Sequence, residues 1–382
     1  MDEISLENLI SFIGYYSTSK KEKRETVIRF LNLFEKKLLQ MIPFLNSQEI
    51  LQVFYSYIKR NVGSEELIRK LENRTLSIID QFNVREIEKL IVLVSASPIR
   101  EEIFDAIEKK ILKSIKTLKP YNFPGIFFTF AMNNIGTELF YNIFTDKIIS
   151  SLFVFTPEQV SKLVWSYSVK MPSAELFFKK AQEYIIANSE KFSINDIANL
   201  VWSFTEVRKG SNLMFLKLEE QINNKAANLT VKEVAKVFWG YVNKLALSKK
   251  TVDSFVVIIK KNLDELDAWD LTTILWAFTR FKIEEYDGLY DILKNQTKNL
   301  CNEMNNYELV TSIRAYSEKK KLSKDLLEVF LKKLEFSIKS LTKQECLILI
   351  NSLIQVQDVS NDLELVVDSL DKRLYDFEIG KT

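Results

Sequence analysis

The hydrophobic positions of this chain follow a helical period within short segments. In the segment 160–167, apolar side chains stand at Val160, Leu163, Val164 and Tyr167. This spacing places them on one side of an α-helix, because successive helical residues are rotated by about 100°. The segment 197–204 has the same pattern. The chain is therefore predicted to contain a series of related amphipathic helices.

A tryptophan marks the same place in four such segments, "LVWSYSV", "LVWSFTEV", "VFWGYVN" and "ILWAFTR", at intervals of 37 residues. Related segments extend the series, and we call its ten members the grid positions: Gly14, Tyr55, Val92, Phe128, Trp165, Trp202, Trp239, Trp276, Arg314 and Asn351. Self-similarity at this period is typical of solenoids, in which each repeat buries its apolar face against its neighbours. The sequence therefore predicts an all-α solenoid of about ten 37-residue helix-turn-helix repeats. We expect a single domain, 1–382, with repeats that begin near 5, 46, 83, 119, 156, 193, 230, 267, 305 and 342.

Start signals for helices recur at fixed distances from the grid positions. Eight N-cap residues are each followed three residues later by an acid or amide: Asn46–Glu49, Asn83–Glu86, Thr156–Gln159, Ser193–Asp196, Thr230–Glu233, Asp267–Asp270, Asn305–Glu308 and Thr342–Glu345. This is the capping box, so we interpret these acids as structural. A second helix is predicted to start after Ser64, Thr137, Ser211, Ser248, Ser323 and Ser360, with Ser173 one residue early. Gly63, Gly136 and Gly210 precede three of these caps, where glycine can end the first helix in a left-handed turn.

The grid residue lies nearly opposite the core stripe of the first helix. Its neighbours on the helical surface, four residues before it and three residues after it, are often small, as in Ala198 and Thr205. We therefore expect each tryptophan to act as a wedge that packs one repeat onto the next. The alternative is that the tryptophans form a row of stacking platforms for nucleobases.

The exposed stripe of the first helices is predicted at positions −7, −3 and +4 relative to the grid residue. It carries amides, hydroxyls, cations and a few aromatic side chains, a mixture that suits single-stranded RNA. Its candidate RNA-binding residues are Gln52, Lys59, Arg85, Lys89, Lys162, Asn199, Lys232, Lys236, Trp269, Thr273, Arg280 and Tyr307. An ordinary solvated helix face has much the same composition, so both interpretations stay open.

Composition excludes several kinds of chemistry. The chain has no histidine, so histidine-based triads and metal sites are excluded, and its two cysteines provide no disulfide framework. It has no Walker loop, no G-x-G-x-x-G and no C-x-x-C. The net charge of only +2 does not indicate a strongly charged binding partner. We therefore expect a protein that is not an enzyme, with no catalytic residues, metal, cofactor, small-molecule substrate or membrane insertion.

First-helix sequences such as "VSKLVWSYSV" and "IANLVWSFTEV" resemble the heptatricopeptide repeats of apicomplexan organelle proteins, which are close relatives of algal octotricopeptide repeats. The resemblance covers nearly the whole chain and is clearest from 156 to 320. Many members of that family end in a nuclease-like domain called RAP. The residues after Asn351 leave room for one helix only, so we expect no RAP domain.

This resemblance implies a non-catalytic RNA-binding protein of the mitochondrion. The expected RNA is single-stranded or fragmented ribosomal RNA, bound by a component or assembly factor of the mitochondrial ribosome beside ribosomal or other organellar proteins. The acidic start "MDEISLENLI" does not read as a transit peptide, so a cytoplasmic location is the alternative. The alternative function on the same fold is a protein–protein interaction scaffold of an organellar complex.

Overall fold

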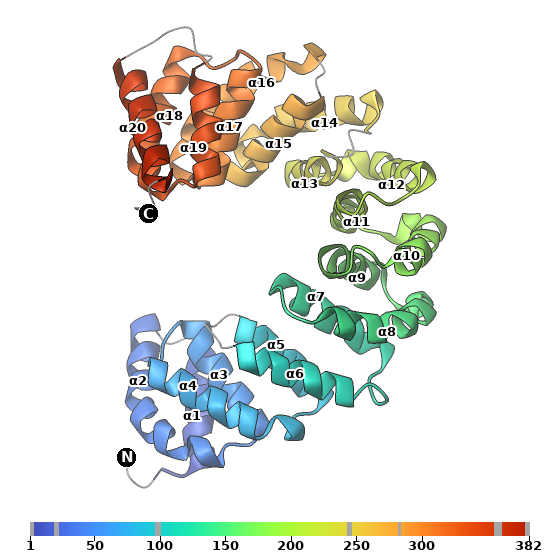
Figure 1. Ribbon diagram of the computed structural model, residues 1–382, viewed down its shortest axis with the longest axis vertical. Coiled ribbons are helices and arrows are strands. Elements are labelled where there is room, and N and C mark those ends of the chain that lie inside the picture. Colours follow the sequence, from blue (N-terminus) through green and yellow to red (C-terminus); the bar gives the residue numbers. More distant parts are fainter. Residues whose placement is uncertain are drawn as a thin grey trace. The chain divides into compact units, whose positions relative to one another are not determined.

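The computed structural model describes residues 4–18, 23–95, 101–242, 247–281, 284–354 and 361–378. Regular structure in these residues consists of twenty α-helices and ten short 3-10 helices, without a strand (Figure 1). The predicted all-α solenoid of helical repeats is confirmed. The chain divides into two compact units, Met1–Tyr184 and Ile185–Thr382.

The first compact unit stacks its helices in two rows (Figure 1). Its helices are α1 (Leu6–Thr18), α2 (Arg24–Met41), α3 (Ser47–Arg60), α4 (Glu65–Ser77), α5 (Val84–Ser95), α6 (Glu101–Lys113), α7 (Phe123–Met132), α8 (Glu138–Ser150), α9 (Pro157–Lys170) and most of α10 (Glu175–Ala187). The first helices of the repeats pack in chain order, α1 on α3, α3 on α5, α5 on α7 and α7 on α9. The second helices α2, α4 and α6 pack on one another in the other row.

The second compact unit continues the same scheme. Its helices are α11 (Ile194–Glu206), α12 (Asn212–Lys225), α13 (Val231–Tyr241), α14 (Lys249–Lys261), α15 (Ala268–Phe281), α16 (Gly288–Leu300), α17 (Asn306–Glu318), α18 (Lys324–Ser337), α19 (Lys343–Leu353) and α20 (Asn361–Glu378). The first helices α11, α13, α15, α17 and α19 pack in order. Helix α20 lies against both α18 and α19.

The predicted capping boxes form. The Thr230 hydroxyl accepts a hydrogen bond from the Glu233 N–H at 3.2 Å, and the Glu233 carboxylate accepts one from the Thr230 N–H at 3.0 Å. All eight predicted pairs make such reciprocal bonds. The acids that recur in this pattern therefore satisfy backbone donors at the start of each first helix.

The predicted caps of the second helices form in part. The hydroxyls of Ser64, Thr137, Ser211 and Ser248 accept hydrogen bonds from the backbone three residues later. Ser323 stands at the N-cap of α18, but its hydroxyl makes no capping bond. Helix α10 begins at Glu175, so Ser173 lies before the cap position, and Ser360 lies outside the described residues.

The first helices end before the predicted glycines. The left-handed residues lie six places after the grid position, at Asn61, Asn134, Arg208 and Lys320. The next N–H then bonds back to the helix, as Val62 does to the Tyr57 carbonyl at 3.1 Å, which is the Schellman arrangement. The glycines follow two places later with φ between 89° and 109°, so they turn the loop rather than end the helix.

A recurrent 3-10 turn joins each second helix to the next repeat. Eight of these turns begin thirteen residues before a grid position: Ile42–Phe44, Ile79–Gln81, Leu152–Val154, Ser189–Lys191, Ala226–Asn228, Leu263–Glu265, Cys301–Glu303 and Ile338–Ser340. A buried apolar residue follows each turn, immediately before the N-cap, as Phe192 does before Ser193. Together with buried Ile197 it has the spacing of a hydrophobic staple, which fixes the direction in which the chain enters the helix.

Buried side chains tie neighbouring repeats together. The tyrosine two places after the grid position donates its hydroxyl hydrogen to a carbonyl of the preceding second helix: Tyr57 to Leu31 (2.8 Å), Tyr167 to Tyr141 (3.4 Å), Tyr241 to Phe215 (3.3 Å) and Tyr316 to Tyr290 (3.3 Å). In parallel, a glutamate of one second helix accepts from the N-cap N–H of the next, as Glu219 does from Ser248 at 2.8 Å. These hydrogen bonds join residues of different helices, so the sequence pattern within one helix does not reveal them.

Candidate functional site

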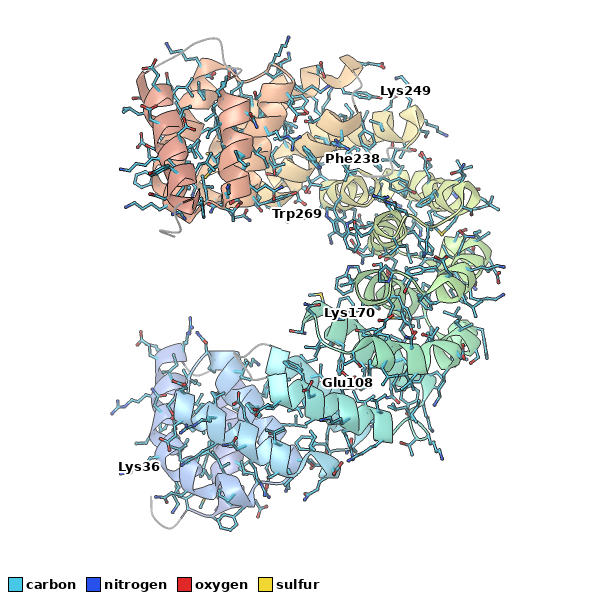
Figure 2. The ribbon with its side chains drawn as sticks, viewed as in Figure 1. Lys36, Glu108, Lys170, Phe238, Lys249 and Trp269 are labelled. Carbon is cyan, nitrogen blue, oxygen red and sulfur yellow. The ribbon has the colours of Figure 1, made fainter. Side chains whose placement is uncertain are left out.

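The first helices display all twelve candidate residues to solvent. Ten are exposed, and Lys162 and Thr273 are half-buried. Figure 2 labels Trp269 on the first-helix side of the second compact unit and Lys249 on the second-helix side. The helical register predicted this exposure, because positions −7, −3 and +4 project from one side of each first helix.

The grid residues border this exposed stripe and stack on one another. The rings of Trp202 and Trp239 are nearly parallel, 7° apart in plane, with their centroids 5.1 Å apart. Trp165 packs on Phe128 with a centroid distance of 5.2 Å. All four grid tryptophans remain half-buried. The wedge interpretation is therefore incomplete: these residues bridge adjacent first helices, but they also show part of each ring to solvent.

Small residues one place after the grid set the close approach of the first helices. Gly240 of α13 faces the backbone of α11, and a Cβ added there would lie only 2.5 Å from the Ala198 carbonyl oxygen. The equivalent residues in six other repeats are also small and buried: Ser56, Ser166, Ser203, Ala277, Ala315 and Ser352. The recurrence of Ser, Gly and Ala after the grid residue is the sequence signal for this contact.

The cations of the stripe differ in their surroundings. The Lys162 ammonium lies 2.6 Å from the Glu158 carboxylate, and the Lys232 ammonium lies 3.4 Å from Asp267. The Lys59 ammonium donates to the Tyr55 hydroxyl at 2.7 Å and lies 4.9 Å from that ring's centroid. By contrast, Arg85, Lys89 and Lys236 make no ion pair with an acid in the described part of the chain.

Three recesses open on this face. One of about 1000 Å³ lies between α3 and α5, and its lining includes Gln52, Tyr55, Arg85 and Lys89. In the second compact unit, a recess of about 160 Å³ is lined by Trp202, Trp239, Val242, Trp269, Thr272, Thr273, Trp276, Tyr307 and Thr311. A third, of about 340 Å³, is lined by Trp276, Tyr307, Val310, Thr311, Arg314, Thr342, Gln344, Glu345 and Ile348.

These recesses bring half of the candidate residues together. Gln52, Arg85 and Lys89 meet in the first recess, and Trp269, Thr273 and Tyr307 meet in the second. The other six candidates line none of the three: Lys59, Lys162, Asn199, Lys232, Lys236 and Arg280.

The recess walls also include grid residues that are absent from the predicted set of site residues: Tyr55, Trp202, Trp239, Trp276 and Arg314. The sequence could have predicted this placement. Positions 0 and −7 differ by only about 20° around the helix axis, so the grid residue projects beside a residue of the exposed stripe.

Among the described residues, no cluster of three or more Cys, Asp or Glu side chains has the arrangement of a metal site. Within the same residues, no helix has the length and apolar character needed to cross a bilayer. Comparison with protein-family models and with curated proteins gives no match to this chain.

Proposed function

We propose that this chain is a non-catalytic helical-repeat protein that binds single-stranded RNA along the exposed face of its first helices. The supporting observation is that aromatic rings, hydroxyls or amides, and cations together line two of the recesses, those of about 1000 Å³ and 340 Å³. Rings stack on unpaired bases, hydroxyls and amides reach base edges, and cations hold phosphates. A net charge of only +2 implies that any attraction to RNA is local to this face.

The resemblance to heptatricopeptide repeats extends the proposal to a biological setting. In that setting the RNA is single-stranded or fragmented ribosomal RNA, and the protein is a component or assembly factor of the mitochondrial ribosome. Its neighbours are then ribosomal or other organellar proteins.

The salt dependence of RNA binding tests which face is used. Lys89 and Lys236 lie exposed on α5 and α13, one in each compact unit. Replacing both by alanine removes two phosphate contacts, so the log–log slope of affinity against salt should fall by about 1.4, since each contact on a single strand contributes about 0.7. The measurement is fluorescence polarisation with a labelled single-stranded RNA over a range of salt concentrations.

The matched control is Lys179→Ala with Lys332→Ala, which removes two exposed lysines from the second helices α10 and α18. The control should keep the slope of the original protein. An equal effect of both pairs would contradict the assignment to the first-helix face. If the original protein binds no RNA, the proposed function is wrong.

A protein scaffold is the second candidate, and the second helices favour it. Leu139 and Ile143 of α8 are 63% and 42% exposed, and Leu213 and Leu216 of α12 are 54% and 62% exposed. Each pair is spaced three or four residues apart and so forms a small apolar patch on its helix. Such patches suit an amphipathic partner helix. A protein that binds no RNA but assembles through these patches fits the scaffold.

A further inference from the structure

The aromatic side chains of the second compact unit converge from four first helices. Four of the chain's five tryptophans, with Tyr307, line the recess of about 160 Å³. They come from α11, α13, α15 and α17. The volume is below the roughly 300 Å³ at which pockets for drug-sized molecules begin. The recess therefore suits a single flat ring rather than a larger metabolite.

A second compartment adjoins this one. The recess of about 340 Å³ shares Trp276, Tyr307 and Thr311 with the first and adds Arg314 and Gln344. Two compartments with a common aromatic wall can hold two rings that are consecutive in one ligand. Thr273, Thr311 and Gln344 supply hydrogen-bonding groups along the lining.

The charges around the shared wall decide which ligand fits. Aromatic recesses bind quaternary ammonium ions as well as bases. Here two guanidinium groups lie against Trp276: the central carbon of Arg314 is 4.9 Å from the ring centroid, and that of Arg280 is 5.6 Å away. A cationic ligand would be repelled by the exposed Arg280, whereas a ligand that joins rings through a phosphate would be attracted.

The acid in the lining does not reverse this preference. Among the described residues that line the two compartments, Glu345 is the one with an acidic side chain. Its carboxylate already accepts the capping bond from the Thr342 N–H at 2.7 Å. The Arg314 guanidinium is paired with Glu318 at 2.5 Å, but Arg280 is exposed and makes no ion pair with a described acid.

We infer that the two compartments between α11 and α19 bind two consecutive unpaired nucleotides of single-stranded RNA. The bases stack on the tryptophan and tyrosine rings, and the intervening phosphate lies near Arg280 and Arg314. This inference rests on the proposed function and narrows it. Base binding is concentrated in one aromatic cluster instead of being spread evenly over ten repeats.

The test is the affinity of the full chain for hexa-adenylate and hexa-uridylate, followed by quenching of tryptophan fluorescence. Trp269→Ala with Tyr307→Ala removes two rings that are 36% and 63% exposed in the folded protein. Affinity should fall at least about tenfold, since stacking of one base on one ring contributes about fivefold or more and two rings are removed. Trp269→Phe with Tyr307→Phe keeps the rings and should restore most of the affinity.

Tyr121→Ala is the matched control. Tyr121 occupies the same −7 position in another repeat, is 57% exposed and lies outside this cluster. The Tyr121→Ala variant should bind both oligonucleotides with the affinity of the original chain. Circular dichroism of each variant verifies that the helices are intact.

The outcomes separate the inference from the proposed function. If the original chain binds the oligonucleotides and the double alanine variant binds them equally well, the inference is overturned while RNA binding stands. Binding of tetramethylammonium at this cluster in place of the oligonucleotides would also overturn it. If the original chain binds neither oligonucleotide nor longer single-stranded RNA, both statements fail.

Discussion

Six buried tyrosines show how much single side chains depend on their surroundings. Burial is the main reason why the pKa of the phenol is raised in Tyr57, Tyr141, Tyr167, Tyr241, Tyr290 and Tyr316. Several of these hydroxyls are also donors to carbonyls, a role that requires the neutral form. These residues are therefore structural groups of the repeat and not general acids or bases at neutral pH.

The tyrosines predict how stability depends on pH. Their pKa in the folded chain lies above the unfolded value of 10.0, so the neutral form is favoured by folding. Their contribution is fully present below about pH 10 and is lost as the pH rises toward the native pKa. Urea unfolding between pH 8 and pH 11 should show a falling midpoint above pH 10, together with the absorbance of tyrosinate. A midpoint that stays constant across this range would contradict the prediction.

At the scale of elements, the spacing of the first helices is set by small residues and not by the tryptophans. Gly240 permits the backbones of α11 and α13 to meet, and the stacked rings of Trp202 and Trp239 then cover the edge of that contact. The two features depend on each other, because a wider helix spacing would separate the rings.

Gly240→Ala tests this contact. The added methyl group would lie 2.5 Å from the Ala198 carbonyl oxygen, so the two helices must move apart. Overpacking of this kind costs about 1–3 kcal/mol of unfolding free energy, measured by urea titration. Gly125→Ala is the control, because a Cβ at Gly125 of α7 meets no atom within 4 Å. That variant should be unchanged or slightly stabilised, by about 0.5–1 kcal/mol. Equal effects of the two substitutions would show that helix contact is not the cause.

At the scale of the whole molecule, the helices of each compact unit contact mainly their neighbours along the array. Stability in such an array is approximately a sum of repeat and interface terms. Helix α20 has buried Leu363, Val366 and Leu370, and it lies against both α18 and α19. It therefore covers apolar surface of the second unit that would otherwise meet water.

Removal of the residues from Asn361 onward should destabilise the second compact unit selectively. The lost cover exposes the apolar sides of α18 and α19, the two helices that α20 packs against. Hydrogen exchange followed by mass spectrometry should show reduced protection in α17 to α19 and unchanged protection in α1 to α6. A uniform loss of protection across both units would show that the array folds as one cooperative body.

The sequence by itself determined the helical class, the period of the repeats and the eight capping boxes. Each of these depends on interactions within a few residues, such as Thr230 with Glu233, or on a repeated apolar pattern. The pairing of Lys162 with Glu158 is also local, four residues apart, and could have been predicted from the sequence. Exposure of the candidate stripe followed from the same helical geometry.

Only the tertiary structure decided which candidate residues meet. Lys232 and Asp267 are 35 residues apart, and the recess around Trp276 draws its walls from four different first helices. The close contact of Gly240 with Ala198 depends likewise on the distance between two helices. These arrangements depend on how one repeat is placed on the next. A helical pattern specifies the direction of each side chain from its own axis, but packing between repeats sets the distance and rotation between axes.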